Sequence, residues 1–247
     1  NFWYQIIVQN NPSQKVRVME KKPFKAILFD LDGTLLHTAP DLTVAVNNLR
    51  IEYGLPALPT DEAIAMVGRG AINLVRRALR EVIDQTTKRG ESFDIDAAYA
   101  RFATHYHAVN GSNTVEYAGV TNTLQRLHAQ GIQLAIVTNK PSEFSVPLVR
   151  QFGWDTLFEA VVCGDTTPFK KPNPAPLVFA LQQLAVDADE ALMVGDSMND
   201  ALAAQAAGCA CTILSYGYNE GIPMRDALNE QQLSIPVFDE FAHAVPA

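Results

Sequence analysis

The stretch Phe24-Lys25-Ala26-Ile27-Leu28-Phe29-Asp30-Leu31-Asp32-Gly33-Thr34 decides the fold. Apart from one lysine, every residue before Asp30 in this stretch is apolar, which is typical of a strand buried on both faces of a parallel sheet. Two carboxylates, Asp30 and Asp32, end the run. Buried carboxylates are unfavourable unless a metal ion or a reaction compensates them, and open α/β sheets bind ligands just beyond such strand ends. We therefore expect a functional site here.

The second half of the chain predicts strands that alternate with helices. Apolar runs predict buried strands over 133–138, 160–163, 191–195 and 211–214. Helical patterns lie beside them over 120–130, 142–152, 174–184 and 199–207. This alternation is typical of a parallel sheet covered by helices on both faces. The predicted fold class is therefore α/β, a Rossmann-like core, with an irregular tail from Tyr216 that holds only a short helix at 224–228.

A block of helices interrupts this alternation after the first strand. Helical patterns cover 41–53, 60–67, 71–82 and 94–109, and no strand pattern separates them. We expect residues 42–112 to form a helical cap domain, inserted between a first core part at 24–41 and a second at 113–247. Residues 1–23 are expected to be an N-terminal extension without a motif, with Met19 as a candidate natural start.

Composition bounds the classes of function. The chain has 247 residues, 48% of them hydrophobic, which is enough for a sizeable core. Its net charge of −8 argues against a nucleic-acid partner, and no apolar run has the length of about 18 residues that a membrane span needs. Three cysteines without framework spacing indicate a reducing compartment, so we expect a cytoplasmic protein. Cys209 and Cys211 are interpreted as small buried residues rather than a metal pair.

Polar residues follow several of the predicted strands. Asp30 and Asp32 follow the first strand, Thr138-Asn139-Lys140 follows the next, and Asp196-Ser197-Met198-Asn199-Asp200 follows a third, with Lys170–Leu177 between them. If the strands are parallel, these groups meet at one edge of the sheet. Clustered carboxylates need a counter-charge, and Mg²⁺ is a cation that prefers oxygen ligands. Such a site leaves one carboxylate to attack a phosphorus atom, while metal, lysine and hydroxyl hold the phosphoryl charge.

These four stretches, in this order, resemble the four motifs of the haloacid-dehalogenase-like hydrolases, over residues 24 to about 215. The resemblance implies that Asp30 is the nucleophile and a metal ligand. It implies that Asp32 is the general acid and base and that its backbone carbonyl also binds the metal. An acid/base carboxylate at this position favours phosphate ester hydrolysis or phosphosugar mutation over dehalogenation.

The resemblance also implies roles for the other stretches. Thr138, Asn139 and Lys171 would bind the phosphoryl group, and Lys171 would also steady the nucleophile. Asp196 would ligate Mg²⁺, and Asp200 would ligate it or orient its waters. Two structural alternatives stay open: Thr138 only ends its strand, and Asp200 is a charge favoured at a helix N-terminus. Lys170 is expected to be solvated, because the family pattern places its lysine directly before the proline, at Lys171.

The cap region and the Thr138 stretch resemble bacterial phosphoglycolate phosphatases. Gly68 and Gly70 would let backbone N–H groups approach a small anion. Arg69 would pair with a substrate carboxylate, the alternative being a solvated surface charge. The chain departs from the resemblance at His37-Thr38, where Asp-Ser is usual, and at Tyr117–Val120, where Pro is missing before Gly.

We therefore expect a Mg²⁺-dependent phosphatase for a small phosphorylated metabolite, acting as a monomer or homodimer. The favoured reaction converts 2-phosphoglycolate to glycolate through an aspartyl-phosphate intermediate. The alternatives are a phosphosugar phosphatase, a phosphosugar mutase, a non-enzymatic phosphometabolite sensor and a protein-interaction domain.

Overall fold

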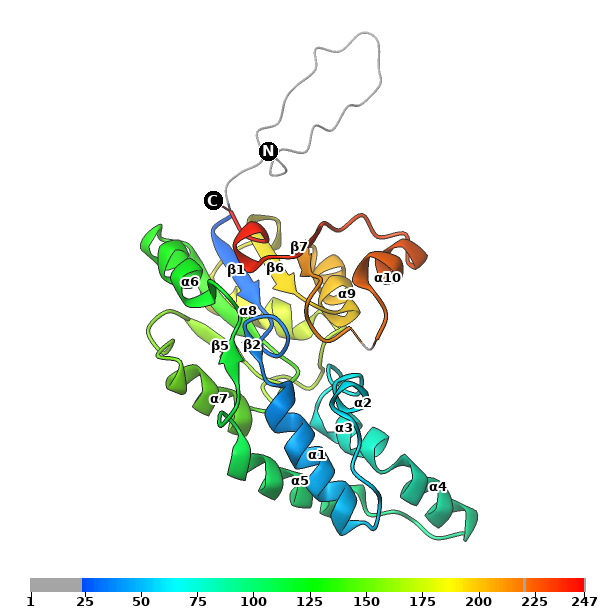
Figure 1. Ribbon diagram of the computed structural model, residues 1–247. Helices are drawn as coiled ribbons and strands as arrows, with labels where there is room; N and C mark the ends of the chain where they lie inside the picture. Colours follow the sequence, from blue (N-terminus) through cyan, green and yellow to red (C-terminus); the bar gives the residue numbers. More distant parts are fainter. Residues whose placement is uncertain (1–23, 220, 247) are drawn as a thin grey trace, which may run out of the picture.

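The computed structural model describes residues 24–219 and 221–246 (Figure 1). The expected N-terminal extension and Met19 lie outside these residues. A six-stranded sheet in the order β5-β4-β1-β6-β7-β8 forms the core, and every neighbouring pair of strands is parallel. Its strands are β1 (Ala26–Phe29), β4 (Gln133–Val137), β5 (Ala160–Val162), β6 (Ala191–Gly195), β7 (Ala210–Leu214) and β8 (Val237–Phe238). The predicted α/β class is therefore confirmed.

Alternate residues of the strands enter two different hydrophobic clusters, one on each face of the sheet. In β1, Ile27 and Phe29 pack on one face, whereas Ala26 and Leu28 pack on the other. The first face is covered by α6 (Val120–Ala129), α7 (Ser142–Gln151) and the 3-10 helix η2 (Phe241–His243). The second face is covered by α8 (Ala175–Leu184) and α9 (Met198–Ala207). Burial on both faces explains why these strands read as apolar runs.

Figure 1 shows a block of helices beyond the carboxyl ends of the strands. Its members are α1 (Ala39–Glu52), α2 (Thr60–Ile64), α3 (Ala71–Ala78), α4 (Arg80–Lys88) and α5 (Ile95–Val109). Their apolar faces share one cluster, to which Phe144 of α7 and Tyr218 also belong. The prediction of one continuous helix over 71–82 was wrong, because the helix breaks at Leu79 into α3 and α4. Leu79 is fully buried, so packing within the block outweighs the local helical preference there.

The tail after Tyr216 is more ordered than predicted. The helix predicted at 224–228 is confirmed as α10 (Met224–Glu230), and β8 adds the edge strand of the sheet. A second, two-stranded antiparallel sheet pairs β2 (Leu36–His37) with β3 (Val115–Glu116), where the chain passes between the sheet and the helical block. Within the described residues, none of the helices combines the length and the apolar character that crossing a membrane demands.

Candidate active site

The centre of the site is Asp30, directly after the central strand β1. Its backbone N–H donates to the carbonyl of Val194 in β6 at 3.0 Å, so the sheet ladder fixes its position. Its Oδ1 accepts a hydrogen bond from the backbone N–H of Leu31 at 2.7 Å. About 14% of its side chain is exposed, which leaves the carboxylate within reach of a ligand.

Asp196 follows the neighbouring strand β6 and is held by hydrogen bonds at both carboxylate oxygens. Thr34 donates to Oδ1 at 2.7 Å, and the backbone N–H of Tyr218 donates to Oδ2 at 2.5 Å. Two glycines make room for it: a Cβ atom would lie 2.3 Å from Oδ2 at Gly33 and 2.2 Å from it at Gly217. The tail, predicted to be irregular, therefore supplies part of the site through Tyr218, which was not among the site residues predicted from the sequence.

Asp200 lies in the first turn of α9 and forms a capping box with Ser197. Its Oδ2 accepts from the Ser197 backbone N–H at 3.1 Å and from the Ser197 hydroxyl at 2.7 Å. Its Oδ1 accepts from the Lys171 ammonium at 2.6 Å. The helix-terminus role and a place in the site are thus compatible, because each uses a different oxygen.

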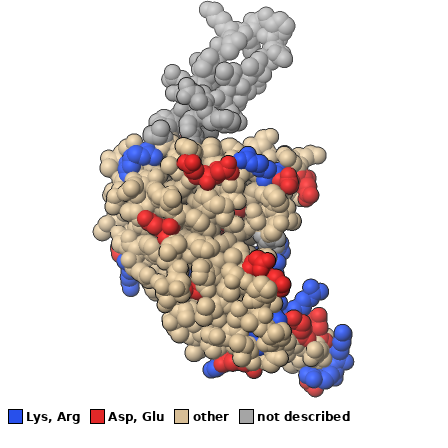
Figure 2. All heavy atoms as spheres, viewed as in Figure 1, with Lys and Arg blue, Asp and Glu red and all other residues tan. Residues whose placement is uncertain are grey.

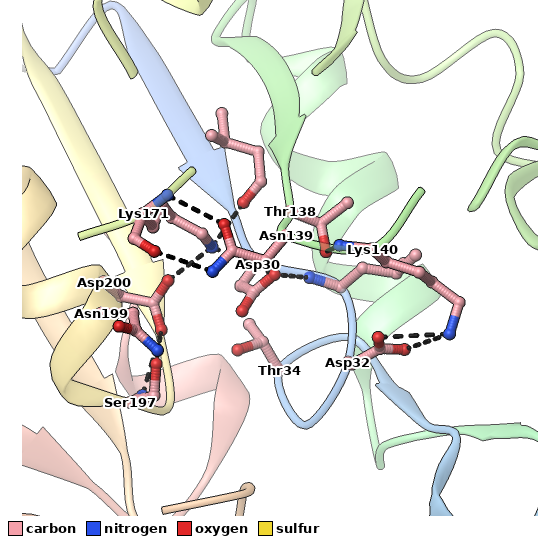
Figure 3. A network of polar contacts seen from close by, with 12 residues as sticks. Asp30, Asp32, Thr34, Thr138, Asn139, Lys140, Lys171, Ser197, Asn199 and Asp200 are labelled. Carbon is pink, nitrogen blue, oxygen red and sulfur yellow. Dashed lines mark hydrogen bonds and ion pairs between the residues drawn. The ribbon is translucent and has the colours of Figure 1, made fainter. Parts of the chain in front are cut away.

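Lys171 is buried between the carboxylates (Figure 3). Its ammonium lies 3.1 Å from Asp30 Oδ1 and 2.6 Å from Asp200 Oδ1, and it donates to the carbonyl of Val137 at 2.6 Å. These acceptors match the three N–H donors of an ammonium. Burial disfavours the charged form, but the charges of Asp200 and Asp30 outweigh it and raise the pKa of Lys171.

Asn139 holds the segment of Lys171 in place. Its Oδ1 accepts from the Lys171 backbone N–H at 2.9 Å, and its Nδ2 donates to the Lys171 carbonyl at 2.9 Å and to the Gly68 carbonyl at 3.1 Å. The side-chain amide is thus already engaged, so Asn139 positions Lys171, and its contact with phosphate stays a prediction. Thr138 beside it is buried, and its hydroxyl oxygen accepts from the Lys140 backbone N–H at 3.2 Å.

The carboxylates of Asp30, Asp196 and Asp200 lie close enough to share a cation. Each offers one oxygen, and these oxygens lie within 4.8 Å of one another. Burial, opposed by Lys171 and reinforced by Asp200 and Asp32, raises the pKa of Asp30 to about 7. Burial and the charges of Asp30 and Asp200 raise the pKa of Asp196 well above its usual value. A donor set made only of oxygen, short of positive charge, fits a hard divalent cation such as Mg²⁺.

Asp32 lies on the side of Asp30 away from Lys171 and has partners of its own (Figure 3). Its Oδ1 accepts from the Thr38 hydroxyl at 2.8 Å, and its two oxygens lie 3.0 and 3.2 Å from the Lys140 ammonium. That ammonium also donates to the Tyr106 hydroxyl at 2.6 Å. Neither Lys140 nor Tyr106 was among the site residues predicted from the sequence. The only signal for Lys140 was its place two residues after Thr138 at the same strand end.

A pocket that is partly open to solvent lies between the sheet and the helical block. Asp30, Asp32, Thr138 and Lys140 line it from the sheet, and Gly68 and Gly70 line it from the block. Arg69, between the two glycines, is exposed and is not among the lining residues. Lys170, expected to be solvated, is half-buried, with its ammonium next to Gly70.

Comparisons with known proteins show the family to which the chain belongs. A family model described as haloacid dehalogenase-like hydrolase matches residues 27–214. A phosphoglycolate phosphatase of Pasteurella multocida is 41% identical over 219 residues, which covers 89% of this chain and 96% of that protein. One of Pseudomonas savastanoi pv. phaseolicola is 42% identical over 202 residues, covering 82% of this chain and 73% of that protein.

A solved structure agrees as well. The crystal structure of a predicted phosphoglycolate phosphatase from Haemophilus somnus has a TM-score of 0.79 and 35% identity, and the match covers 89% of this chain and 95% of that one. The chain therefore belongs to the haloacid dehalogenase-like hydrolases. Within that family, it is an enzyme similar to phosphoglycolate phosphatases.

On the face seen in Figure 2, Lys and Arg are scattered among acidic residues and form no continuous basic patch.

Proposed function

We propose that this protein is a Mg²⁺-dependent phosphatase that hydrolyses 2-phosphoglycolate to glycolate and phosphate. The observation that carries the proposal is the group of three carboxylates of Asp30, Asp196 and Asp200. The buried Lys171 contacts Asp30 and Asp200, and Asp30 lines the pocket. The substrate is inferred from the relatives, several of which are named phosphoglycolate phosphatase. The metal would be held by the three carboxylates and would supply positive charge to the phosphoryl oxygens.

Asp30 is the proposed nucleophile. The Leu31 N–H and the Lys171 ammonium both bind Oδ1, which leaves Oδ2 to attack the phosphorus atom. The new O–P bond makes an aspartyl-phosphate as the ester O–P bond breaks. Lys171 and the hydroxyl of Thr138 would hold the negative charge of the phosphoryl group during this transfer.

Asp32 is the proposed acid and base. In the first step its carboxyl gives a proton to the leaving oxygen of glycolate. In the second step the carboxylate takes a proton from a water molecule that attacks the phosphorus, which releases phosphate and restores Asp30. Thr38 and Lys140 hold Asp32 at the pocket wall, where it is separate from the carboxylates around Lys171.

Phosphate release from a panel of phosphomonoesters, with and without Mg²⁺, tests this function. We expect 2-phosphoglycolate to give the highest kcat/KM, and a chelator to abolish turnover until Mg²⁺ is restored. A preference for hexose phosphates would favour the phosphosugar phosphatase instead. An isomerised phosphosugar without net phosphate release would identify a mutase, and binding without any turnover would identify a sensor.

Two substitutions test the covalent route. Asp30→Asn should lower kcat by at least about a thousandfold, because an amide cannot replace the nucleophile. Asp32→Asn should lower it by about a hundredfold or more. The matched control is Asp84→Asn on the exposed side of α4, which should turn over normally. Substantial turnover by a pure Asp30→Asn protein would rule out the aspartyl-phosphate.

Cytoplasmic location and a monomeric or homodimeric state stay predictions from the sequence.

A further inference from the structure

The pocket carries a second polar group besides the carboxylates around Lys171. It consists of the ammonium of Lys140, directly after β4, and the hydroxyl of Tyr106 in α5, which both line the pocket. Lys140 is 5% exposed and Tyr106 is 1% exposed. The ammonium lies 2.6 Å from the hydroxyl and 3.0 Å from Asp32. One member comes from the sheet and the other from the helical block, so the pair spans the pocket.

Both groups carry hydrogen-bond donors. Within residues 24–219 and 221–246, the three N–H donors of the Lys140 ammonium face three oxygens, the two of the Asp32 carboxylate and that of the Tyr106 hydroxyl. The Tyr106 oxygen accepts from Lys140, and the described part of the chain offers no acceptor for its own proton. An anionic ligand in the pocket can therefore accept from Tyr106, and from Lys140 once Asp32 gives up a bond to the ammonium.

The surroundings favour an anion over a neutral group. The ring of Tyr106 packs against those of Phe102 and Phe144, with centroids 5.6 and 4.7 Å away, and all three rings line the pocket. Apolar walls of this kind strengthen the attraction between an ammonium and an anion. In the proposed reaction the carboxyl of Asp32 binds the leaving oxygen of the substrate. This contact competes with the bonds between Asp32 and Lys140. A second anionic group of the substrate would then become the partner of Lys140.

We propose that Lys140 and Tyr106 form a carboxylate subsite that selects small phosphomonoesters bearing a carboxylate over phosphomonoesters of equal size without one. This inference rests on the proposed function, since it presumes that the phosphoryl group is bound at Asp30. It moves the role that the sequence analysis gave to Arg69 onto Lys140, which is buried in the pocket wall.

Inhibitors without a leaving oxygen test the subsite apart from the acid function of Asp32. 3-Phosphonopropionate has the shape of 2-phosphoglycolate, and in propylphosphonate a methyl group replaces the carboxylate. We expect the native protein to bind phosphonopropionate at least about tenfold more tightly, as judged by competitive inhibition constants. Lys140→Met should abolish this difference, and Tyr106→Phe should reduce it about threefold. The control Lys88→Met, on the exposed end of α4, should retain it.

Turnover gives a second readout with 2-phosphoglycolate and ethyl phosphate as the pair. The ratio of their kcat/KM values should fall at least about tenfold in Lys140→Met, whereas a role limited to holding Asp32 would lower both values equally. If Lys140→Met and Tyr106→Phe keep the native preference for the carboxylated compounds, the proposed subsite is wrong, whereas the proposed function still stands. The absence of a native preference for the carboxylated members would overturn the proposed substrate as well. If Lys140→Met fails to fold, as judged by circular dichroism, Tyr106→Phe decides the matter by the same ratios.

Discussion

The ionised carboxylate of Asp30 is unfavourable for the folded chain but is required for the proposed reaction. Its carboxylate is buried beside other carboxylates, and Lys171 offsets the cost only in part, so its pKa is raised to about 7 from an ordinary value of 3.8. A nucleophile must be ionised to attack phosphorus, and a metal ligand must be ionised to bind. The residue is therefore held in a state that the folded chain alone disfavours and that a bound cation would stabilise.

A pH dependence of stability follows for the metal-free protein. Because the folded state binds the Asp30 proton more tightly than the unfolded chain does, stability should fall as the pH rises from about 4 towards about 7. Asp30→Asn removes the titrating group, so its stability should decline less over that range. Chemical unfolding midpoints in chelator at several pH values measure the difference. If the unfolding midpoint changes equally with pH in Asp30→Asn and in the native protein, the raised pKa of Asp30 is contradicted. Asp84→Asn serves as the control.

Asp41 in the first turn of α1 joins two elements that are far apart in sequence. Its carboxylate is fully buried and accepts from the backbone N–H groups of Gly111 and Asn113 at 3.0 and 2.9 Å, and from the Thr114 hydroxyl at 2.7 Å. It therefore ties the chain entering the helical block to the chain leaving it. The same carboxylate lies at the N-terminus of a helix, where the dipole favours negative charge.

Asp41→Ala should lower the free energy of unfolding by about 2 to 5 kcal/mol, because the buried Thr114 hydroxyl and the part-buried N–H groups of Gly111 and Asn113 lose their charged acceptor. Urea unfolding measures this loss. The control is Asp96→Ala, since Asp96 occupies the first turn of α5 but is exposed. It should cost no more than about 1 kcal/mol, the usual worth of a charge at a helix N-terminus. Equal losses for the two variants would show that the hydrogen bonds of Asp41 contribute nothing beyond the dipole.

At the scale of the whole molecule, the pocket exists because the helical block sits on the edge of the sheet. We propose that residues 42–112 act as a cap domain, with the connections around Asp41 and Gly111 as its boundaries. Phe144 belongs to α7 of the sheet part, yet it packs within the cluster of the block and lines the pocket. The distance between the two parts therefore depends on a side chain that both share. Closure of this cap over the pocket would exclude bulk water and favour small substrates.

Phe144→Ala should lower the free energy of unfolding by about 3 to 5 kcal/mol, because it empties a buried aromatic site. It should also raise KM for 2-phosphoglycolate, since Phe144 is part of the pocket wall. The control is Phe241→Ala, because Phe241 is equally buried but packs on the sheet face, among residues apart from the pocket. It should lose comparable stability with KM unchanged. A rise in KM in both variants would mean that instability, not the pocket wall, causes it.

Local sequence predicts some elements better than others, for physical reasons. The strand 191–195 is observed at those bounds as β6, because burial on both faces demands an unbroken apolar run. The two-residue strands β2, β3 and β8 were missed, since two residues carry no periodicity and pair only once the fold is formed. The break at Leu79 was missed because the apolar pattern continues through it.

The sequence by itself determined the α/β class, the order of strands and helices, and the clustering of Asp30, Asp196, Asp200 and Lys171 at one sheet edge, because parallel strands all end there. Only the tertiary structure decided which groups pair. The bonds of Lys140 to Asp32 and Tyr106, and of Tyr218 to Asp196, join segments that are far apart along the chain. Hydrogen bonds depend on distance and direction in space, and local residue patterns carry neither.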